Sequence, residues 1–337
     1  MPKVSVIVPV FNAEPWLGAC LDSALGQTRR DIEIVCVNDG STDGSAAVLA
    51  EYAAHDPRVR VLSQANCGQG AARNRGLTIS EGEYIYFMDA DDELAVPDAL
   101  ERVVGMMEAL SLDLALFDAE TCFDDGCELF ARQVRAESYI RRRDYSAPRT
   151  GGRMLADMCR HNDWTASPPL AMLRRDMLVA EGLSFPEGII YEDNIFMLRT
   201  FLAARRVAHR PWRLYVRHVH RDTTITKPLS IANLKGYLEC WLFTCETLSS
   251  GQQLPCSIRR ALTGRSQRFK WHICDIVRRL GEPVDRLYGQ LTEREAADLR
   301  RALIVSPLEK IGNAFRCLQD NGLSYTAKRI LFGRRDA

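Results

Sequence analysis

The sequence YIYFMDADD occupies residues 84–92 and joins an apolar run to a cluster of carboxylates. We expect Tyr84–Met88 to form a buried strand, because short apolar runs rich in β-forming residues are typical of sheet cores. Alternate side chains of an extended segment share a face, so Asp89 and Asp91 can point the same way. Hard oxygen ligands suit Mg²⁺ or Mn²⁺, which can also bind a diphosphate. The alternative is an acidic turn that caps the following helix.

The first 120 residues alternate short apolar runs with segments of helical pattern. Strands separated by helices require crossover connections, which predicts an α/β fold with a Rossmann-like, mostly parallel sheet flanked by helices. The expected strands are Val4–Val10, Ile32–Asn38, Val59–Ser63, Tyr84–Met88 and Leu114–Phe117, and the expected helices are Trp16–Leu25, Ser45–Ala54, Gly70–Ile79 and Val96–Leu110. In such sheets ligands bind at the carboxyl ends of the strands, so the residues that follow each strand are candidates for the site.

Composition narrows the class of protein and of partner. The chain of 337 residues carries 44 Lys and Arg against 44 Asp and Glu, which gives no indication of a nucleic-acid partner. No CxxC pair occurs among the eleven cysteines, so we expect reduced thiols in the cytosol. The opening MPKVSVIVPVF is predicted to be a strand and not a signal peptide. No apolar stretch approaches the roughly 20 residues of a membrane span.

Two further polar motifs follow expected strands. The run NDGSTDGS at 38–45 releases carboxylates at a strand end, where we expect Asp39 to face a ligand and Asp43 to be structural. The run NCGQGAARNRG at 66–76 is a loop that enters a helix, with Arg73 one turn inside. Backbone amides at a helix start favour anions. The loop does not match GxGxxG, which excludes a nicotinamide dehydrogenase.

Together with VPVFNAE at 8–14, these motifs occur in the order found in family 2 glycosyltransferases of the GT-A fold, and the chain resembles the members that build bacterial surface polysaccharides. The resemblance is strong over residues 3–95 and patchy to 226. It implies a nucleotide-sugar donor, usually UDP-linked, and a Mn²⁺ or Mg²⁺ cofactor held by Asp91 and Asp89. The nucleotide-binding residues that it implies are Pro9, Phe11, Glu14, Asp39, Gly68, Arg73 and Asp89, with the nucleobase at Pro9, Phe11 and Asp39.

The family also has an acidic pair that opens a helix in its second half, and here the matching sequence is YEDN at 191–194. By this resemblance Asp193 is the catalytic base and Glu192 lies on the acceptor side. Inversion requires a carboxylate opposite the leaving diphosphate, where it takes the proton of the acceptor hydroxyl. A helix N-terminus favours the ionised carboxylate. The alternative is that both residues only stabilise the first turn of the helix.

Two more residue types are candidates on the later part of the chain. The sequence YVRHVHRDTT at 215–224 carries two histidines, and many GT-A enzymes have a late histidine that helps to hold the metal or the diphosphate. His220 is our candidate for that role, with His218 next. Trp164 precedes the sequence SPP and could stack on an acceptor sugar, although burial in the core is the more common role of such a ring.

The expected organisation is a GT-A catalytic domain over residues 1–226 and a helical C-terminal extension over 227–337. The catalytic domain divides into a nucleotide-sugar half, 1–120, and an acceptor half, 121–226, which opens with an irregular connecting segment to about residue 165. The basic, apolar-rich segment Leu308–Phe332 is expected either to contact the cytoplasmic face of the inner membrane or to pack on the catalytic domain.

The resulting hypothesis is inverting transfer of a hexosyl or N-acetylhexosaminyl group from a nucleotide-sugar to a hydroxyl of a glycan or lipid-linked acceptor. One alternative is a nucleotidyltransferase that makes a sugar nucleotide. That enzyme would share the sheet and the acidic metal ligands, but we would expect a glycine-rich, basic signature that residues 8–14 lack. The other alternative is a non-catalytic nucleotide-binding scaffold, which would not need the motif carboxylates that are all present here.

Overall fold

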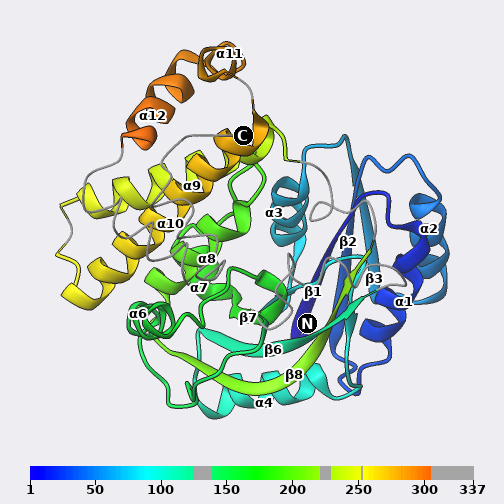
Figure 1. The fold of residues 1–337 in the computed structure, drawn as a ribbon. Coiled ribbons are helices and arrows are strands. Elements are labelled where there is room, and N and C mark those ends of the chain that lie inside the picture. Colours follow the sequence, from blue (N-terminus) through cyan, green and yellow to red (C-terminus); the bar gives the residue numbers. More distant parts are fainter. Residues whose placement is uncertain (124–138, 221–228, 252, 282, 305–337) are drawn as a thin grey trace. The chain divides into compact units, whose positions relative to one another are not determined.

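The computed structural model describes residues 1–123, 139–220, 229–251, 253–281 and 283–304 (Figure 1). In chain order its elements are β1 (Val4–Val10), α1 (Glu14–Leu25), β2 (Ile32–Asp39), α2 (Ser45–His55), β3 (Val59–Gln64), α3 (Gln69–Ile79), β4 (Tyr84–Phe87), β5 (Glu93–Leu94), α4 (Ala99–Ala109), β6 (Leu114–Phe123), α6 (Gly151–His161), the 3₁₀ turn η3 (Pro168–Leu170), β7 (Ala171–Arg174), α7 (Arg175–Ala180), α8 (Glu192–Ala203), β8 (Val207–Val219), α9 (Ile231–Ser249), α10 (Cys256–Leu280), α11 (Val284–Tyr288) and α12 (Glu293–Leu303).

The described strands form one sheet in the order β3-β2-β1-β4-β7-β6-β8-β5. β3, β2, β1 and β4 run parallel, as the sequence predicts, so their carboxyl ends meet at one edge. β7 is antiparallel to β4 and to β6, whereas β6 and β8 are parallel. β5 pairs antiparallel with β8. This pairing brings the late strand β8 beside the segment that follows the carboxylate cluster at 89–92.

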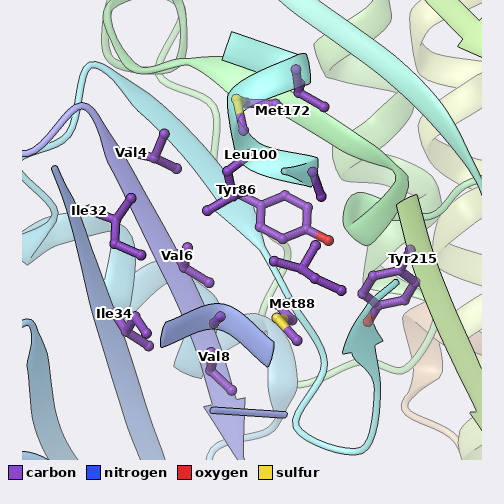
Figure 2. Close-up of a cluster of buried hydrophobic side chains, with 14 of the residues drawn as sticks. Val4, Val6, Val8, Ile32, Ile34, Tyr86, Met88, Leu100, Met172 and Tyr215 are labelled. Atoms are coloured by element: carbon purple, nitrogen blue, oxygen red, sulfur yellow. The ribbon is translucent and has the colours of Figure 1, made fainter. Parts of the chain in front are cut away.

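The core forms on both faces of β1, which is buried along its whole length. Continuous apolar strands are typical of parallel sheets that helices cover on both sides. Val4, Val6 and Val8 share one face with Ile32 and Tyr86 (Figure 2), and buried side chains of α1 and α4 pack there too. The alternate residue Ile7 points to the opposite face, where α3 packs closely at Gly76.

The prediction of an irregular segment up to about residue 165 is wrong in part, because the structure has helix α6 at Gly151–His161. The Gly-Gly pair at its start suggests a loop, but each glycine allows a close contact instead. A Cβ on Gly151 would collide with the carbonyl of Phe201, and one on Gly152 would collide with the side chain of Ile258. The buried residues Met154, Leu155 and Met158 lie at helical spacing.

Other differences concern the ends of elements. β6 continues to Phe123 and does not end at Phe117, because it pairs with the long strand β8 along this length. The helix predicted from Val96 begins at Ala99, after a turn in which the amide of Ala99 donates to the carbonyl of Val96. No pattern in the sequence predicts the short strand β5, because its two residues are too few to show one.

The chain divides into two compact units: residues 1–228 with 253–261, and residues 229–252 with 262–337. In the second unit Thr292 caps α12, where it accepts a hydrogen bond from the amide of Glu295. Among the described residues no helix is long and apolar enough to cross a bilayer. The segment Leu308–Phe332 lies outside the described residues.

The close packing of α3 on β1 predicts a difference between two glycine substitutions. Gly76→Ala places a methyl group against the buried Ile7 and should lower the free energy of unfolding by about 1–3 kcal/mol. Gly105→Ala lies at an exposed helical position with no atom near the added methyl, so it should raise that free energy by about 0.5–1 kcal/mol. Urea unfolding measures both. Equal effects of the two changes would contradict this packing.

Candidate active site

The motif residues meet where the parallel strands end. β1 leads to Phe11, β2 ends at Asp39, and β4 leads to Asp89. Pro9 is buried within β1, whereas Phe11 is 49% exposed. This edge is where ligands bind in open α/β sheets, because the loops there leave side chains and backbone amides accessible.

Asp39 fixes the loop that leads into α3. Its Oδ1 accepts hydrogen bonds of 2.8 Å from the amide of Cys67 and from Nε2 of Gln64, and its Oδ2 accepts one of 2.8 Å from the amide of Gly68. Gly68 has φ +90°, a conformation that favours glycine. Asp39 and Gly68, both predicted to bind nucleotide, therefore contact each other directly.

Carboxylates also join the loops that follow β1 and β2. Glu14 accepts a hydrogen bond of 2.8 Å from the amide of Gly44, and its own amide donates to Asp43 at 3.0 Å. Although partial burial opposes ionisation, hydrogen bonds from Ser45 and from the amide of Glu14 hold the pKa of Asp43 below its usual range. Glu14 thus holds the two loops together, in addition to any contact with a nucleotide.

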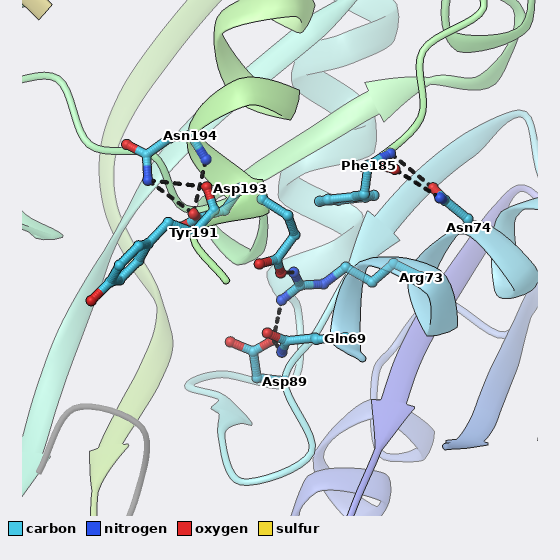
Figure 3. A network of polar contacts seen from close by, with 9 residues as sticks. Gln69, Arg73, Asn74, Asp89, Phe185, Tyr191, Asp193 and Asn194 are labelled. Atoms are coloured by element: carbon cyan, nitrogen blue, oxygen red, sulfur yellow. Dashed lines mark hydrogen bonds and ion pairs between the residues drawn. The ribbon is translucent and has the colours of Figure 1, made fainter. Parts of the chain in front are cut away.

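The guanidinium of Arg73 links two parts of the site (Figure 3). Nη1 donates to Oε1 of Glu192 at 2.9 Å, and Nη2 donates to Oδ1 of Asp89 at 2.8 Å. Only 3% of the Arg73 side chain is exposed. Burial opposes its charge, but Asp89 and Glu192 outweigh this effect and raise the pKa of Arg73. The residues predicted on the donor and acceptor sides are therefore connected through one buried cation.

Asn74, which follows Arg73 in α3, holds the segment that precedes α8. The side chain of Asn74 donates to the carbonyl of Phe185 at 2.9 Å and accepts from its amide at 2.8 Å. Gly70 lets this segment approach, since a Cβ there would lie 2.7 Å from the carbonyl oxygen of Pro186 and 3.1 Å from Glu192. Close approach therefore explains why the loop motif carries a glycine at this position.

The four-residue cluster Asp89-Ala90-Asp91-Asp92 contains carboxylates in different environments. Asp92 is buried and accepts hydrogen bonds from the Tyr215 hydroxyl at 2.8 Å and from the amide of His218 at 2.7 Å. Burial and the negative charge of Asp91 raise its pKa well above the usual range. Burial and Asp89 raise the pKa of Asp91, whose carboxylate receives no hydrogen bond from another described residue. Asp92 is thus a structural carboxylate, and Asp91 is available to a ligand.

The late histidines lie beside this cluster. His220 is buried, its ring stacks on Trp16 with centroids 4.2 Å apart, and its Nε2 lies 3.4 Å from the carbonyl oxygen of Asp91. Nε2 of His218 lies 3.0 Å from a carboxylate oxygen of Glu93. His220 thus lies beside the backbone of Asp91, although no group of three or more His, Cys, Asp or Glu side chains poised for a metal occurs in the described ranges.

Asp193 lies in the first turn of α8, next to Glu192. Its Oδ1 accepts hydrogen bonds from the backbone and side-chain nitrogens of Asn194 at 2.8 and 3.0 Å. The residue is partly exposed, and no hydrogen bond from a described residue reaches its Oδ2. Enclosure of the carboxyl and the negative charge of Glu192 raise the pKa of Asp193 to about 7. A carboxyl with this pKa can gain or lose a proton near neutral pH.

Sequence reasoning missed several residues that hold this site. Tyr215 reaches the carboxylate cluster from β8, and Phe185 supports Arg73 with its ring centroid 5.1 Å from the guanidinium carbon. These contacts join distant parts of the chain, and no local pattern indicates them. Trp164 is only 8% exposed, which favours the packing role over stacking on a sugar.

The mostly parallel sheet carries a carboxylate cluster at its edge, and Arg73 joins this cluster to an acidic helix start. In a comparison with known proteins, the profile described as "Glycosyl transferase family 2" matches residues 5–180, more than half of the chain. The chain therefore belongs to glycosyl transferase family 2. It is 32% identical over 229 residues to the uncharacterized glycosyltransferase YibD of Escherichia coli. The match covers 67% of this chain and 63% of that relative, which is less than two thirds of its length.

Solved structures confirm the GT-A fold. Residues 1–349 of TarS from S. aureus, solved with UDP-GlcNAc, superpose with a TM-score of 0.62 at 18% identity, covering 99% of this chain and 93% of TarS 1–349. The mannosyltransferase PcManGT from Pyrobaculum calidifontis, solved with GDP-Man and Mn²⁺, gives a TM-score of 0.55 at 18% identity and covers 99% and 88% of the two chains.

The contacts of Tyr215 predict a contrast between two buried tyrosines. Tyr215→Phe leaves a buried oxygen of Asp92 without its donor and should lower the free energy of unfolding by about 1–3 kcal/mol. Tyr86→Phe removes a buried hydroxyl that has no partner among the described residues, so it should leave stability unchanged or raise it. Thermal unfolding compares the variants. A larger loss in Tyr86→Phe than in Tyr215→Phe would refute the bracing role of Tyr215.

Proposed function

We propose that the protein is an inverting glycosyltransferase that moves a hexosyl or N-acetylhexosaminyl group from a UDP-linked donor to a hydroxyl of a glycan or lipid-linked acceptor. The observation that carries this proposal is the carboxyl of Asp193, with its pKa of about 7, at a helix start that Arg73 joins to the carboxylate cluster. Family membership supports glycosyl transfer, and the structure of TarS with UDP-GlcNAc supports a donor of this class.

On the donor side, the proposed roles follow from position and exposure. Phe11 offers an exposed ring for a nucleobase, and Asp39 lies at the next strand end. The three hydrogen bonds that Asp39 accepts keep its carboxylate and the loop at Gly68 in fixed positions. A fixed pocket lowers the entropic cost of ordering a bound nucleotide. We assign Asp89, which Arg73 orients, to the ribose side of the donor.

The residues present suit a divalent metal such as Mn²⁺ or Mg²⁺. The partly exposed carboxylate of Asp91 lies close to the negative charge of Asp89 and has no donor among the described residues, and a cation would relieve this repulsion. Asp89 and Asp91 would hold the metal, with the neighbouring His220 as a third candidate. A bound metal would neutralise charge that develops on the leaving diphosphate. The Mn²⁺ in PcManGT supports this assignment by likeness of fold.

Asp193 is the proposed base. The hydrogen bonds from Asn194 hold Oδ1 and leave Oδ2 to accept the proton of the acceptor hydroxyl. As that proton leaves, the acceptor oxygen attacks the anomeric carbon and the bond to the diphosphate breaks. A base works best when its pKa lies near the operating pH, and the value of about 7 meets this condition.

We also propose a cytoplasmic site of action, on the inner face of the plasma membrane. The described cysteines form no disulfide bond with one another, which supports a reducing compartment. Sedimentation with vesicles that contain anionic lipid tests the membrane contact, and a protein that stays in the supernatant would contradict it.

The direct test of the activity is donor turnover. Purified protein with Mn²⁺, a panel of nucleotide-sugars and acceptor should release a nucleoside diphosphate. Release of pyrophosphate from a nucleoside triphosphate would indicate a nucleotidyltransferase instead, and UDP binding without turnover of any donor would indicate a scaffold.

Asp193→Asn should separate catalysis from stability. Transfer should fall by about 10²–10⁴-fold, because the amide cannot accept the proton, while UDP binding stays unchanged. Ionising Asp193 lowers the free energy of unfolding, because the pKa of its carboxyl is raised in the folded state. This cost is absent below the pKa of the unfolded state, grows as the pH rises toward about 7, and is complete above about 7. The variant should therefore unfold at a higher temperature than wild type at about pH 8 and gain less at about pH 4. Unchanged transfer would remove Asp193 from the base role.

Asp91→Asn should weaken Mn²⁺-dependent UDP binding by about tenfold or more, because a metal ligand loses its charge. Asp92→Asn is the matched control: its carboxylate is occupied by Tyr215 and His218, so this variant should lose stability but keep the metal dependence. Calorimetric titration with UDP, with and without Mn²⁺, measures both. Full metal-dependent binding by Asp91→Asn would exclude Asp91 as a ligand.

A further inference from the structure

Arg73 and Glu192 are 119 positions apart in the sequence, yet they form a buried ion pair of 2.9 Å. The same guanidinium holds Asp89 at 2.8 Å. Glu192 directly precedes Asp193 in the first turn of α8. A continuous path of charged contacts therefore runs from the carboxylate cluster to the helix that carries the proposed base (Figure 3).

The surroundings leave this path little freedom. The guanidinium lies over the ring of Phe185, which stacks on Phe196 of α8 with centroids 3.8 Å apart. Glu192 is 6% exposed and packs at the position that Gly70 leaves open. A buried carboxylate beside a second carboxylate is costly unless a cation compensates it. Arg73 is that cation, and its charge and hydrogen bond oppose the burial that raises the pKa of Glu192.

We propose that Glu192 is a positioning residue of the transfer reaction, held by Arg73 so that its side chain fixes the first turn of α8 and places its carboxylate beside Asp193. This inference rests on the proposed function. It gives Glu192 a role beyond helix stabilisation, because the same carboxylate both orients the base and repels its ionised form.

The groups that face Asp193 act in opposite directions. Glu192 on the same helix raises the pKa of Asp193, whereas Arg73 from α3 and the hydrogen bonds from Asn194 lower it. Burial raises the pKa of Tyr139, and the charge of Asp193 adds to that rise, so Tyr139 stays a neutral neighbour at neutral pH. Removing the charge of Glu192 takes away its repulsion of the ionised Asp193. It also leaves the positive charge of Arg73 with one carboxylate partner fewer. Both changes favour the ionised form of Asp193.

Two substitutions separate the charge of Glu192 from its shape. Glu192→Gln keeps the size but removes the charge, so the pH midpoint of kcat should move down by about one unit from its wild-type position near 7, with an unchanged KM for the donor. Glu192→Asp keeps the charge but shortens the reach to Arg73, so the midpoint should stay while kcat falls by about tenfold. Glu181→Gln, at an exposed position after α7, is the control and should change neither quantity.

A second readout does not depend on turnover. In full-length protein labelled with ¹³C at the aspartate carboxyl carbons, the Asp193 signal is identified by its loss in Asp193→Asn, and its titration midpoint should fall in Glu192→Gln. If the protein is not a glycosyltransferase, the wild type and all variants will show no transfer. The shift of the Asp193 titration midpoint would still occur in that case. A midpoint that stays in place in Glu192→Gln would overturn the proposal. So would a Glu192→Asp variant with wild-type kcat, which also decides the matter if the glutamine variant does not fold.

Discussion

The buried guanidinium of Arg73 is the contact on which the arrangement of this site depends. It binds Asp89, which follows a strand of the parallel sheet, and Glu192, which opens a helix more than a hundred residues later. A guanidinium suits this position because its planar donors reach two carboxylates at once and it stays charged when buried. The neighbouring Asn74 adds hydrogen bonds to Phe185, so a single turn of α3 holds the later segment.

The site concentrates negative charge that a fold optimised for stability alone would avoid. Burial raises the pKa of Asp91, Asp92, Glu192 and Asp193, and in three of them a neighbouring carboxylate is the next largest cause. Tyr215 and Arg73 compensate part of this cost through direct hydrogen bonds. Asp91 and Oδ2 of Asp193 receive no hydrogen bond from another described residue, and these are the groups proposed to meet the metal and the acceptor. Such local instability is common where a protein binds or transforms a ligand.

The sequence predicted the first half of the fold well because each element there carries its own local signal. Apolar runs mark β1, β2, β3 and β4, and the polar residues after them mark the edge that holds the site. Helix α6 was missed because its two opening glycines suggest a loop, and only their contacts with Phe201 and Ile258 show why they are there. The roles of Tyr215 and Phe185 depend on pairing between distant segments, which a single sequence does not reveal.

The stereochemistry of the product tests the central claim most directly. With an active donor whose sugar is α-linked to the diphosphate, proton NMR of the new glycosidic linkage reports the configuration at the anomeric carbon. A base at Asp193, opposite the leaving diphosphate, predicts a β-linked product from that donor. An α-linked product would show retention and would contradict the assignment of Asp193 as the base of a single-displacement transfer.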